Sequence, residues 1–202
     1  MENTSEIRPY QTLRGHTWEV SGVVHLLDGR RIITCSYDGS LRLWDRETGA
    51  QIGNDWREDG DQAKVETIAL SPNGKTVASG SSNGTVRLWD IETRKVTVKW
   101  TEHAQHVTVW SVCWSPDGGR VASGSQNGTV RVWEVESGET VLGTIKTGHR
   151  FVNAVVYSPD GSKIAIGGSD EDAISVWNAR TGELLSRLDQ RSYVWSLAWT
   201  SD

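Results

Sequence analysis

Four tryptophans recur along the chain at intervals of 45, 44 and 44 residues, and each one closes the same short phrase. The phrases read LRLWD, VRLWD, VRVWE and ISVWN. A fixed period of this size indicates a repeat architecture, in which each unit buries its apolar surface by stacking on its neighbours. A function carried by many copies is therefore expected, rather than one catalytic cluster. The repeat tryptophans are Trp44, Trp89, Trp133 and Trp177.

Each period contains the same succession of short runs. An apolar run such as SVCWSPDG is followed by a second run such as RVASGSQNG, and the Trp phrase comes next. Short β-rich runs separated by Gly, Pro, Asn and Asp at intervals of about 8–12 residues predict an all-β fold. Asp38-Gly39, Asn83-Gly84 and Asn127-Gly128 stand between two runs and predict type I′ hairpin turns. Each repeat is predicted to form a four-stranded antiparallel sheet.

These residues resemble the WD40 β-propeller family. Gly15-His16 and Gly148-His149 each place a histidine 28 residues before its Trp, and the SPDG or SPNG turn recurs three times. The Trp-Asp pair is intact in the first two phrases, LRLWD and VRLWD. The resemblance covers nearly the whole chain and implies that each repeat forms one blade of a radial array.

The resemblance also sets the expected domain organisation. Residues 1–9 are expected to be a flexible N-terminus, and 10–202 a WD40 repeat domain with blades at about 17–60, 61–104, 105–147 and 148–188. One further strand is expected at each end, at 10–14 and 193–202, which together make only part of a fifth blade. The ring is therefore not expected to be complete in one chain, and the simplest interpretation is a fragment of a longer array.

Open propeller ends expose strand edges, which are templates for association. Two outcomes are open: several copies close a composite ring, or four blades close with a swapped or collapsed fifth strand. The first makes the chain a homo-oligomer. The candidate assembly edge consists of Tyr193, Trp195 and Trp199.

In the family, a histidine, a hydroxyl, an aspartate and the repeat tryptophan form a hydrogen-bonded tetrad in each blade. A buried indole N–H needs such a partner. The first repeat is the only one with a complete set, which the resemblance places on His16, Asp38 and Trp44. Its hydroxyl is assigned to Ser36, with Thr34, two residues earlier, as the alternative.

The second and third repeats depart from this pattern. Asp61 stands where the histidine is expected in the second repeat, and Asn83 stands in the aspartate position. In the third repeat His103 and His106 compete for the histidine position, and the spacing to Asp117 favours His106. These blades are expected to depend more on packing than on a complete tetrad.

The fourth repeat contains His149 and Trp177, and its turn is one residue longer than the others. This leaves the aspartate position open between Glu171 and Asp172. We expect the fourth blade, like the second and third, to lack the complete network.

Composition favours a soluble cytoplasmic protein, with a nuclear location left open. The sequence has no run of 18 apolar residues and no signal peptide, and Cys35 and Cys113 are expected to be reduced, buried thiols. A net charge of −5 with interspersed signs gives no reason to expect nucleic-acid or membrane binding. The histidine, aspartate and serine residues serve repeat positions, so no metal, no cofactor and no enzyme activity are expected.

Family members often bind partners at the start of the first strand of each blade and just before the turn between the second and third strands. Aromatic and arginine residues at such positions typically dominate binding energy. The competing interpretation is that these side chains merely pack against neighbouring loops. The candidate partner-binding residues are Trp18, Tyr37, Trp110, Arg150 and Phe151.

The leading hypothesis is a non-catalytic protein–protein interaction scaffold that binds a protein or peptide. It would act as a sensor or adaptor in a multidomain signalling protein, because the repeats look similar to the WD40 arrays of STAND-type NTPase receptors. The alternative is a self-assembling propeller fragment whose activity is oligomerisation. A propeller hydrolase ranks last.

Overall fold

The structure is a computed structural model that describes residues 11–58, 60–101, 103, 107–169, 174–188 and 193–200. Within these ranges there are fifteen strands and no helix, so the all-β prediction is confirmed. The strands are β1 (Val20–His25), β2 (Arg31–Ser36), β3 (Leu41–Asp45), β4 (Val65–Leu70), β5 (Thr76–Ser81), β6 (Val86–Asp90), β7 (Val96–Trp100), β8 (Val109–Trp114), β9 (Arg120–Ser125), β10 (Thr129–Glu134), β11 (Thr140–Lys146), β12 (Val152–Tyr157), β13 (Lys163–Gly168), β14 (Ile174–Asn178) and β15 (Leu184–Leu188).

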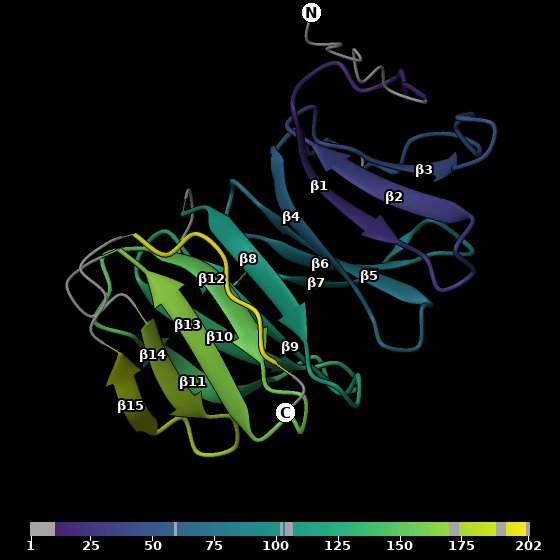
Figure 1. The fold of residues 1–202 in the computed structure, drawn as a ribbon. Helices are drawn as coiled ribbons and strands as arrows, with labels where there is room; N and C mark the ends of the chain where they lie inside the picture. The colour runs from purple at the N-terminus through teal and green to yellow at the C-terminus, as the bar shows by residue number, and fades with distance from the viewer. Residues whose placement is uncertain are drawn as a thin grey trace, which may run out of the picture.

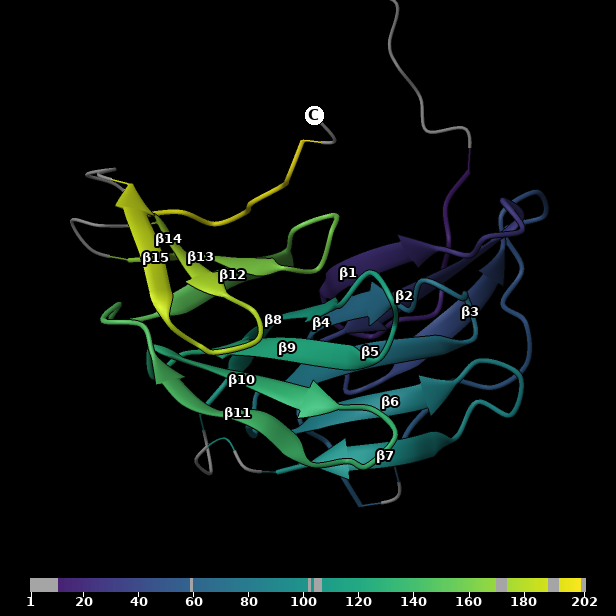
Figure 2. The ribbon, with the colours of Figure 1, turned by 90° about the horizontal axis from the view of Figure 1, so that it is seen from below.

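The strands form four antiparallel sheets, one for each repeat, and each strand pairs with the next along the chain. Three sheets have four strands: β4–β7, β8–β11 and β12–β15. The sheets follow one another along an arc, with β1–β3 at one end and β12–β15 at the other (Figures 1 and 2). We call these sheets blades one to four; the predicted propeller blades are thereby confirmed.

Blade one differs from the expected four strands. Its sheet has three strands, β1–β3, and the next segment makes only two isolated bridges, Trp44 with Gln51 and Leu41 with Trp56. Gly53 lies between these bridges with a φ of 71°, which interrupts an extended strand. Trp56 is nevertheless fully buried, so the segment closes the blade by packing.

The apolar core is divided into three clusters, one between each pair of neighbouring blades. The second strand of each blade is the most buried, because neighbouring blades press on it. This explains its small residues, as in TVASGS and RVASGS. Gly124, for example, lies directly beneath Val152 and Val155 of blade four.

The turns between the second and third strands correct one prediction. Gly39, Gly84 and Gly128 have positive φ, but the Asp or Asn before each does not, so these are not type I′ turns. In blade one the Gly39 amide donates to the Ser36 carbonyl, and the Ser36 amide donates to Ser40. This is a type I turn followed by a left-handed glycine. The Asp38 carboxylate accepts from the Ser40 amide, which explains the preference for Asp or Asn.

Neither end of the described chain adds a strand. Residues 11–16 have no regular secondary structure, and Tyr10 lies outside the described residues. Residues 193–200, the yellow segment in Figure 1, are extended but not part of a ladder. They lie against β12 and β13, where the Val194 amide donates to the Gly168 carbonyl at 3.0 Å. No strand of blade one pairs with blade four.

Substituting Gly124 by Ala tests the tight contact between blades three and four. A Cβ at position 124 would lie 2.4 Å from Val152 and 2.6 Å from Val155, inside normal contact distance. We expect a loss of about 1–3 kcal/mol in the free energy of unfolding, measured by urea denaturation.

Gly143→Ala is the matched control, because nothing lies within 4 Å of a Cβ there. Its effect should stay within about 0.5 kcal/mol. Equal stability of the two variants would contradict the tight blade interface.

Candidate functional site

The start of the first strand and the end of the second lie at the same end of each blade. Cα partners such as Val20 and Ser36, or Val109 and Ser125, place them side by side. We call this end of the blades the turn face. It holds the hydrogen-bonded histidine of blade one and the candidate partner-binding residues.

In blade one the network around Trp44 is complete. The Trp44 indole N–H donates to Thr34 Oγ1 at 2.8 Å, and His16 Nε2 lies 2.7 Å from the same oxygen. His16 Nδ1 lies 2.9 Å from the Asp38 carboxylate. Burial by itself raises the pKa of Asp38, but hydrogen bonds from Ser40, His16 and the Thr17 amide lower it to about 2. The carboxylate is therefore ionised at neutral pH and fixes the histidine.

The hydroxyl of this network belongs to Thr34, which corrects the assignment to Ser36. Thr34 pairs with Arg42 and Trp44 pairs with Ile32, so Thr34 is a diagonal neighbour of Trp44 across the sheet. The Ser36 hydroxyl lies nearer the turn, where it donates to the Trp18 carbonyl at 3.1 Å and accepts from the Asp38 amide. The Ser36 hydroxyl therefore stabilises the turn between β2 and β3.

In blade three His103, rather than the favoured His106, is placed in the network. His103 Nε2 lies 2.7 Å from Ser123 Oγ, which also accepts from the Trp133 indole at 2.9 Å. Burial, with a smaller contribution from Arg131, lowers the pKa of His103 to about 4, so it is neutral at pH 7. His106 lies outside the described residues.

Blade two replaces the histidine and aspartate by an ion pair. Asp61 forms a salt bridge with Arg87 and accepts from the Asn83 side chain at 3.1 Å. Arg87 is buried and also contacts Glu58. The Trp89 indole donates to Ser79. Charge pairing between Asp61 and Arg87 thus replaces the network of blade one.

In blade four the hydroxyl that accepts from the repeat tryptophan comes from the third strand, β14, instead of the second. The position that aligns with Thr34 and Ser123 is occupied by Ile166, whose partner in the next strand is Ser175. Trp177 donates its indole N–H to Ser175 Oγ at 2.8 Å, and His149 Nε2 lies 3.3 Å from the same oxygen. Both candidates for the aspartate, Glu171 and Asp172, lie outside the described residues.

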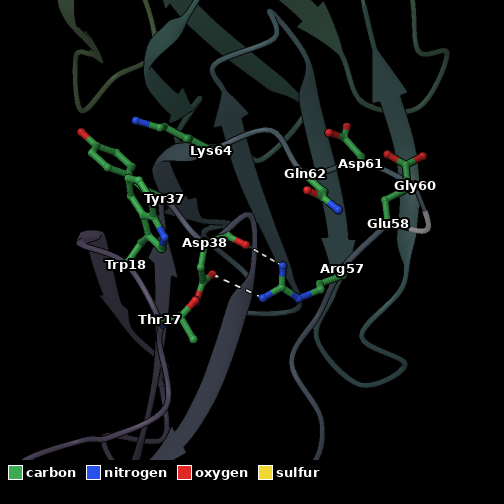
Figure 3. A pocket seen from close by; sticks show the side chains of 10 residues that line it. All are labelled: Thr17, Trp18, Tyr37, Asp38, Arg57, Glu58, Gly60, Asp61, Gln62 and Lys64. Carbon is green, nitrogen blue, oxygen red and sulfur yellow. Dashed lines mark hydrogen bonds and ion pairs between the residues drawn. The ribbon is translucent and has the colours of Figure 1, made fainter.

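The turn face carries a groove between blades one and two (Figure 3). Lys64 Nζ lies 4.8 Å from the centre of the Tyr37 ring and 5.4 Å from that of Trp18. Trp18 is 59% exposed. Figure 3 shows these side chains at one side of the groove and Glu58 and Asp61 at the other. Aromatic and charged groups therefore face one concave surface.

Arg57 also lines this groove, and the sequence pattern did not point to it. Its guanidinium donates to the Asp38 carbonyl at 2.5 Å and to the Asp55 carboxylate at 2.6 Å (Figure 3 shows the Asp38 contacts). The alternation of Asp55 and Arg57 was a weak signal. The contact of Arg57 with Asp38 depends on the path of the irregular segment that follows β3. The sequence of this segment has no periodic pattern.

The remaining candidate residues gather between blades three and four. The rings of Trp110 and Phe151 meet edge to face with centroids 5.4 Å apart, and the Arg150 guanidinium lies 5.0 Å from the Phe151 centroid. The structure thus divides the five candidates into two groups, Trp18 with Tyr37 and Trp110 with Arg150 and Phe151. The second group spans blades three and four, whereas Trp18 and Tyr37 both lie on blade one and contact Lys64 at the entrance of blade two.

The candidate assembly edge is also divided. Tyr193 and Trp195 stack with centroids 6.3 Å apart and are 65% and 73% exposed. Trp199 instead points its indole N–H at the Val156 carbonyl at 3.4 Å. Trp114 makes the same kind of bond to Ala69. Trp199 therefore packs against blade four. Of the three candidate residues, only Tyr193 and Trp195 expose their side chains to solvent.

Other chemistry has little to build on in the described part of the chain. No group of three metal-ligating side chains occurs there. Burial raises the pKa of both Cys35 and Cys113 to about 12, so these thiols stay protonated. A search of the described residues finds no helix long and apolar enough to cross a membrane.

Comparison with known proteins identifies the repeats. The profile of the "WD domain, G-beta repeat" family matches residues 7–45, 57–90, 94–134 and 140–178, more than half of the chain. A guanine nucleotide-binding protein subunit beta from Solanum tuberosum is 40% identical over 70 residues, which is 34% of this chain and 19% of that protein. Human striatin is 36% identical over 64 residues, 30% of this chain and 8% of striatin. The matched segments thus span less than a fifth of either relative.

A double-mutant cycle tests the blade-one network. Thr34→Val keeps the side-chain shape but leaves the Trp44 indole without its acceptor and His16 Nε2 without its hydroxyl partner. We expect it to lower the free energy of unfolding by about 1–3 kcal/mol. Trp44→Phe removes the donor and keeps most of the aromatic bulk.

The double variant should be more stable than the sum of the two single effects predicts, with a coupling energy above about 0.5 kcal/mol. Urea denaturation of all four proteins measures it. Additive effects would mean that Thr34 and Trp44 do not share a buried bond.

Proposed function

Because the chain belongs to the WD domain, G-beta repeat family, we propose that it is a protein-interaction scaffold whose binding surface is the turn face. The observation that carries the proposal is the position of the exposed aromatic and cationic side chains. They lie at two junctions between blades, around Trp18 and Lys64 and around Trp110 and Phe151. A protein or peptide segment that crosses from one junction to the other would contact both.

The physical character of these side chains supports binding of a protein or peptide. Tryptophan, tyrosine and arginine bury large areas and dominate binding energies. The rings already lie in fixed mutual contacts, so little side-chain entropy remains to be lost on binding. Glu66 adds a half-buried carboxyl whose pKa is raised by burial, while a hydrogen bond from Tyr37 opposes that rise. The lining of the groove, which includes Lys64, Asp61 and Trp18, offers cationic, acidic and aromatic contacts together.

The proposed scaffold is non-catalytic. The combination that imitates a catalytic triad, His16, Asp38 and Ser36, is used for structure, since His16 contacts Thr34 and the Ser36 hydroxyl donates to a backbone carbonyl. We further propose a sensor or adaptor role within a longer multidomain protein in the cytoplasm. The two free cysteines support a reducing compartment.

The turn face is tested by affinity purification with quantitative mass spectrometry from cells that express the tagged chain. The Trp110→Ala/Arg150→Ala variant removes one junction, and the Trp18→Ala/Lys64→Ala variant removes the other. If the proposal holds, proteins captured by the wild type fall by roughly ten-fold or more with at least one variant, as expected for interface residues worth more than 1.4 kcal/mol.

The control is Arg30→Ala, an exposed side chain in the turn between β1 and β2, at the opposite end of the blade. It should keep the captured proteins. The proposal fails if both turn-face variants fold and capture the same proteins as the wild type.

A second candidate function, self-assembly, is favoured by the open side of blade one. Val20 and Val23 of β1 are 54% and 55% exposed. Their counterparts in β8, Val109 and Val112, are buried. A partner surface like that of a preceding blade would cover them, and a second copy of the chain carries such surfaces.

Light scattering coupled to size exclusion over a dilution series tests self-assembly. We expect the mass to rise with concentration toward twice the 22.3 kDa of one chain. Val23→Asp should keep the chain monomeric, because a carboxylate would be buried without a partner. Leu185→Asp, on exposed β15, is the control and should behave as the wild type. A wild-type monomer at every concentration would exclude self-assembly of the unaltered chain.

A further inference from the structure

The first strand of every blade carries an aliphatic pair three residues apart. The pair is Val65 and Ile68 in β4, Val109 and Val112 in β8, and Val152 and Val155 in β12. In each of these strands the register shifts just after the first member, for example between Val109 and Ser111. This bulge turns residues i and i+3 to the same side of the sheet, which a regular strand does not do.

A small residue of the preceding blade receives each pair. Gly80 lies beneath Val109, and Gly124 lies beneath Val152 and Val155. Cβ atoms at these glycines would approach the valine side chains within 2.6 Å and 2.4 Å. In blade one Cys35 takes the corresponding position and shares a core cluster with Val65 and Ile68. The contact between blades is therefore one repeated fit of an aliphatic pair onto a small residue.

The groove of blade four at Gly167 is filled by the end of the chain. Val194 and Leu197 lie over it, at 2.5 Å and 3.2 Å from the position of a Gly167 Cβ. They are the same i, i+3 pair in a segment that is not a strand. We call residues 193–200 the plug.

The described contacts of the plug are few. The Val194 amide donates to Gly168, the Asn153 side chain donates to the Val194 carbonyl at 3.1 Å, and Trp199 contacts Val156. Most of its side chains are exposed, and no strand backs it. A complete four-stranded blade at the same place would bring three further strands and bury more apolar surface.

The same aliphatic pair is present and unused in β1, as Val20 and Val23. The register of β1 also shifts, between Val20 and Gly22, so the pair has the same orientation as in the other blades. Both side chains are exposed, and none of the described residues covers them. One molecule thus displays a free aliphatic pair at one end and a plugged small-residue groove at the other.

We propose that the plug and β1 of a second copy compete for the Gly167 groove, so that release of the plug closes two chains head to tail. The proposal rests on the self-assembly described above and specifies its interface and its regulation. Each copy supplies four blades, and eight blades lie within the range of known propellers. Both contacts of such a ring are the same heterologous contact, β1 of one copy on blade four of the other.

Release of the plug is tested in the chain of 202 residues with Val194→Asp/Leu197→Asp. The two carboxylates oppose burial at Gly167 and leave blades one to four unchanged. We expect the dissociation constant of the dimer, from light scattering or analytical ultracentrifugation, to fall at least ten-fold relative to the wild type. The reason is that the fraction of free grooves sets the apparent affinity.

Two further measurements complete the test. Adding Val23→Asp to the released variant should restore the monomer, whereas adding Leu185→Asp should not. A synthetic peptide of residues 193–202 should dissociate the released dimer in trans, and the same peptide with both aspartates should not.

The outcomes separate this inference from self-assembly in general. A wild-type monomer together with a dimeric released variant would support the plug and exclude assembly of the wild type. A wild-type dimer whose dissociation constant does not change in the released variant would overturn the plug and leave self-assembly standing. A released variant that folds, by its circular dichroism, and stays monomeric overturns the plug.

Discussion

The fit of an aliphatic pair onto a small residue of the preceding blade is the contact on which the rest of the structure depends. It explains why the second strands read ASGS, since a larger side chain at Gly80 or Gly124 would force the blades apart. It also explains the three separate core clusters, each shared by two blades. Because a single blade leaves one face of its sheet uncovered, stability must come from the interfaces between blades as much as from the strands. The position of the turn face is a consequence, because the same packing brings the entrance of one blade beside the turn of the previous one.

A second constraint is the buried indole of each repeat tryptophan. Its N–H finds a hydroxyl in all four blades, but the hydroxyl comes from Thr34, Ser79, Ser123 or Ser175. All four blades supply an acceptor for the indole N–H, but the groups around it differ. Blade one has a histidine and a carboxylate, and blade two has an ion pair. This variation changes the charge on the turn face. Blade two presents Glu58, Asp61 and Lys99, whereas blade one buries its His16–Asp38 pair. The repeats thus tolerate surface differences while their packing stays the same.

The sequence alone predicts the blades because periodicity is a property of the whole chain. It does not predict details set by local register. Thr34 and Ser36 both point to the same side of β2, and only the observed hydrogen bond from the Trp44 indole selects Thr34. Which of His103 and His106 reaches the Trp133 network depends on the path of the loop before β8. The number of residues to Asp117 does not determine that path. Dipeptides such as Asp38-Gly39 indicate a turn, but the type I geometry depends on the Ser36–Ser40 bonds across it. The groove at Arg57 was missed because an irregular segment, which includes Gly53, brings Arg57 into contact with Asp38 of the first blade.

A repeat fold also creates its own end surfaces. Every repeat carries both parts of the contact between blades, the aliphatic pair and the small residue. The first described blade therefore exposes its aliphatic pair, and the last has no blade over its small residue. Burying Val20 and Val23 stabilises an assembly by about 1.5–3 kcal/mol each, whereas association of two molecules costs about 4–15 kcal/mol. One such contact is therefore marginal, and the short plug, which is tethered to its groove, competes well against it. In a closed ring two contacts share a single association cost, because the second forms within the complex. Closure rather than the strength of one contact is thus what allows a second copy to displace the plug.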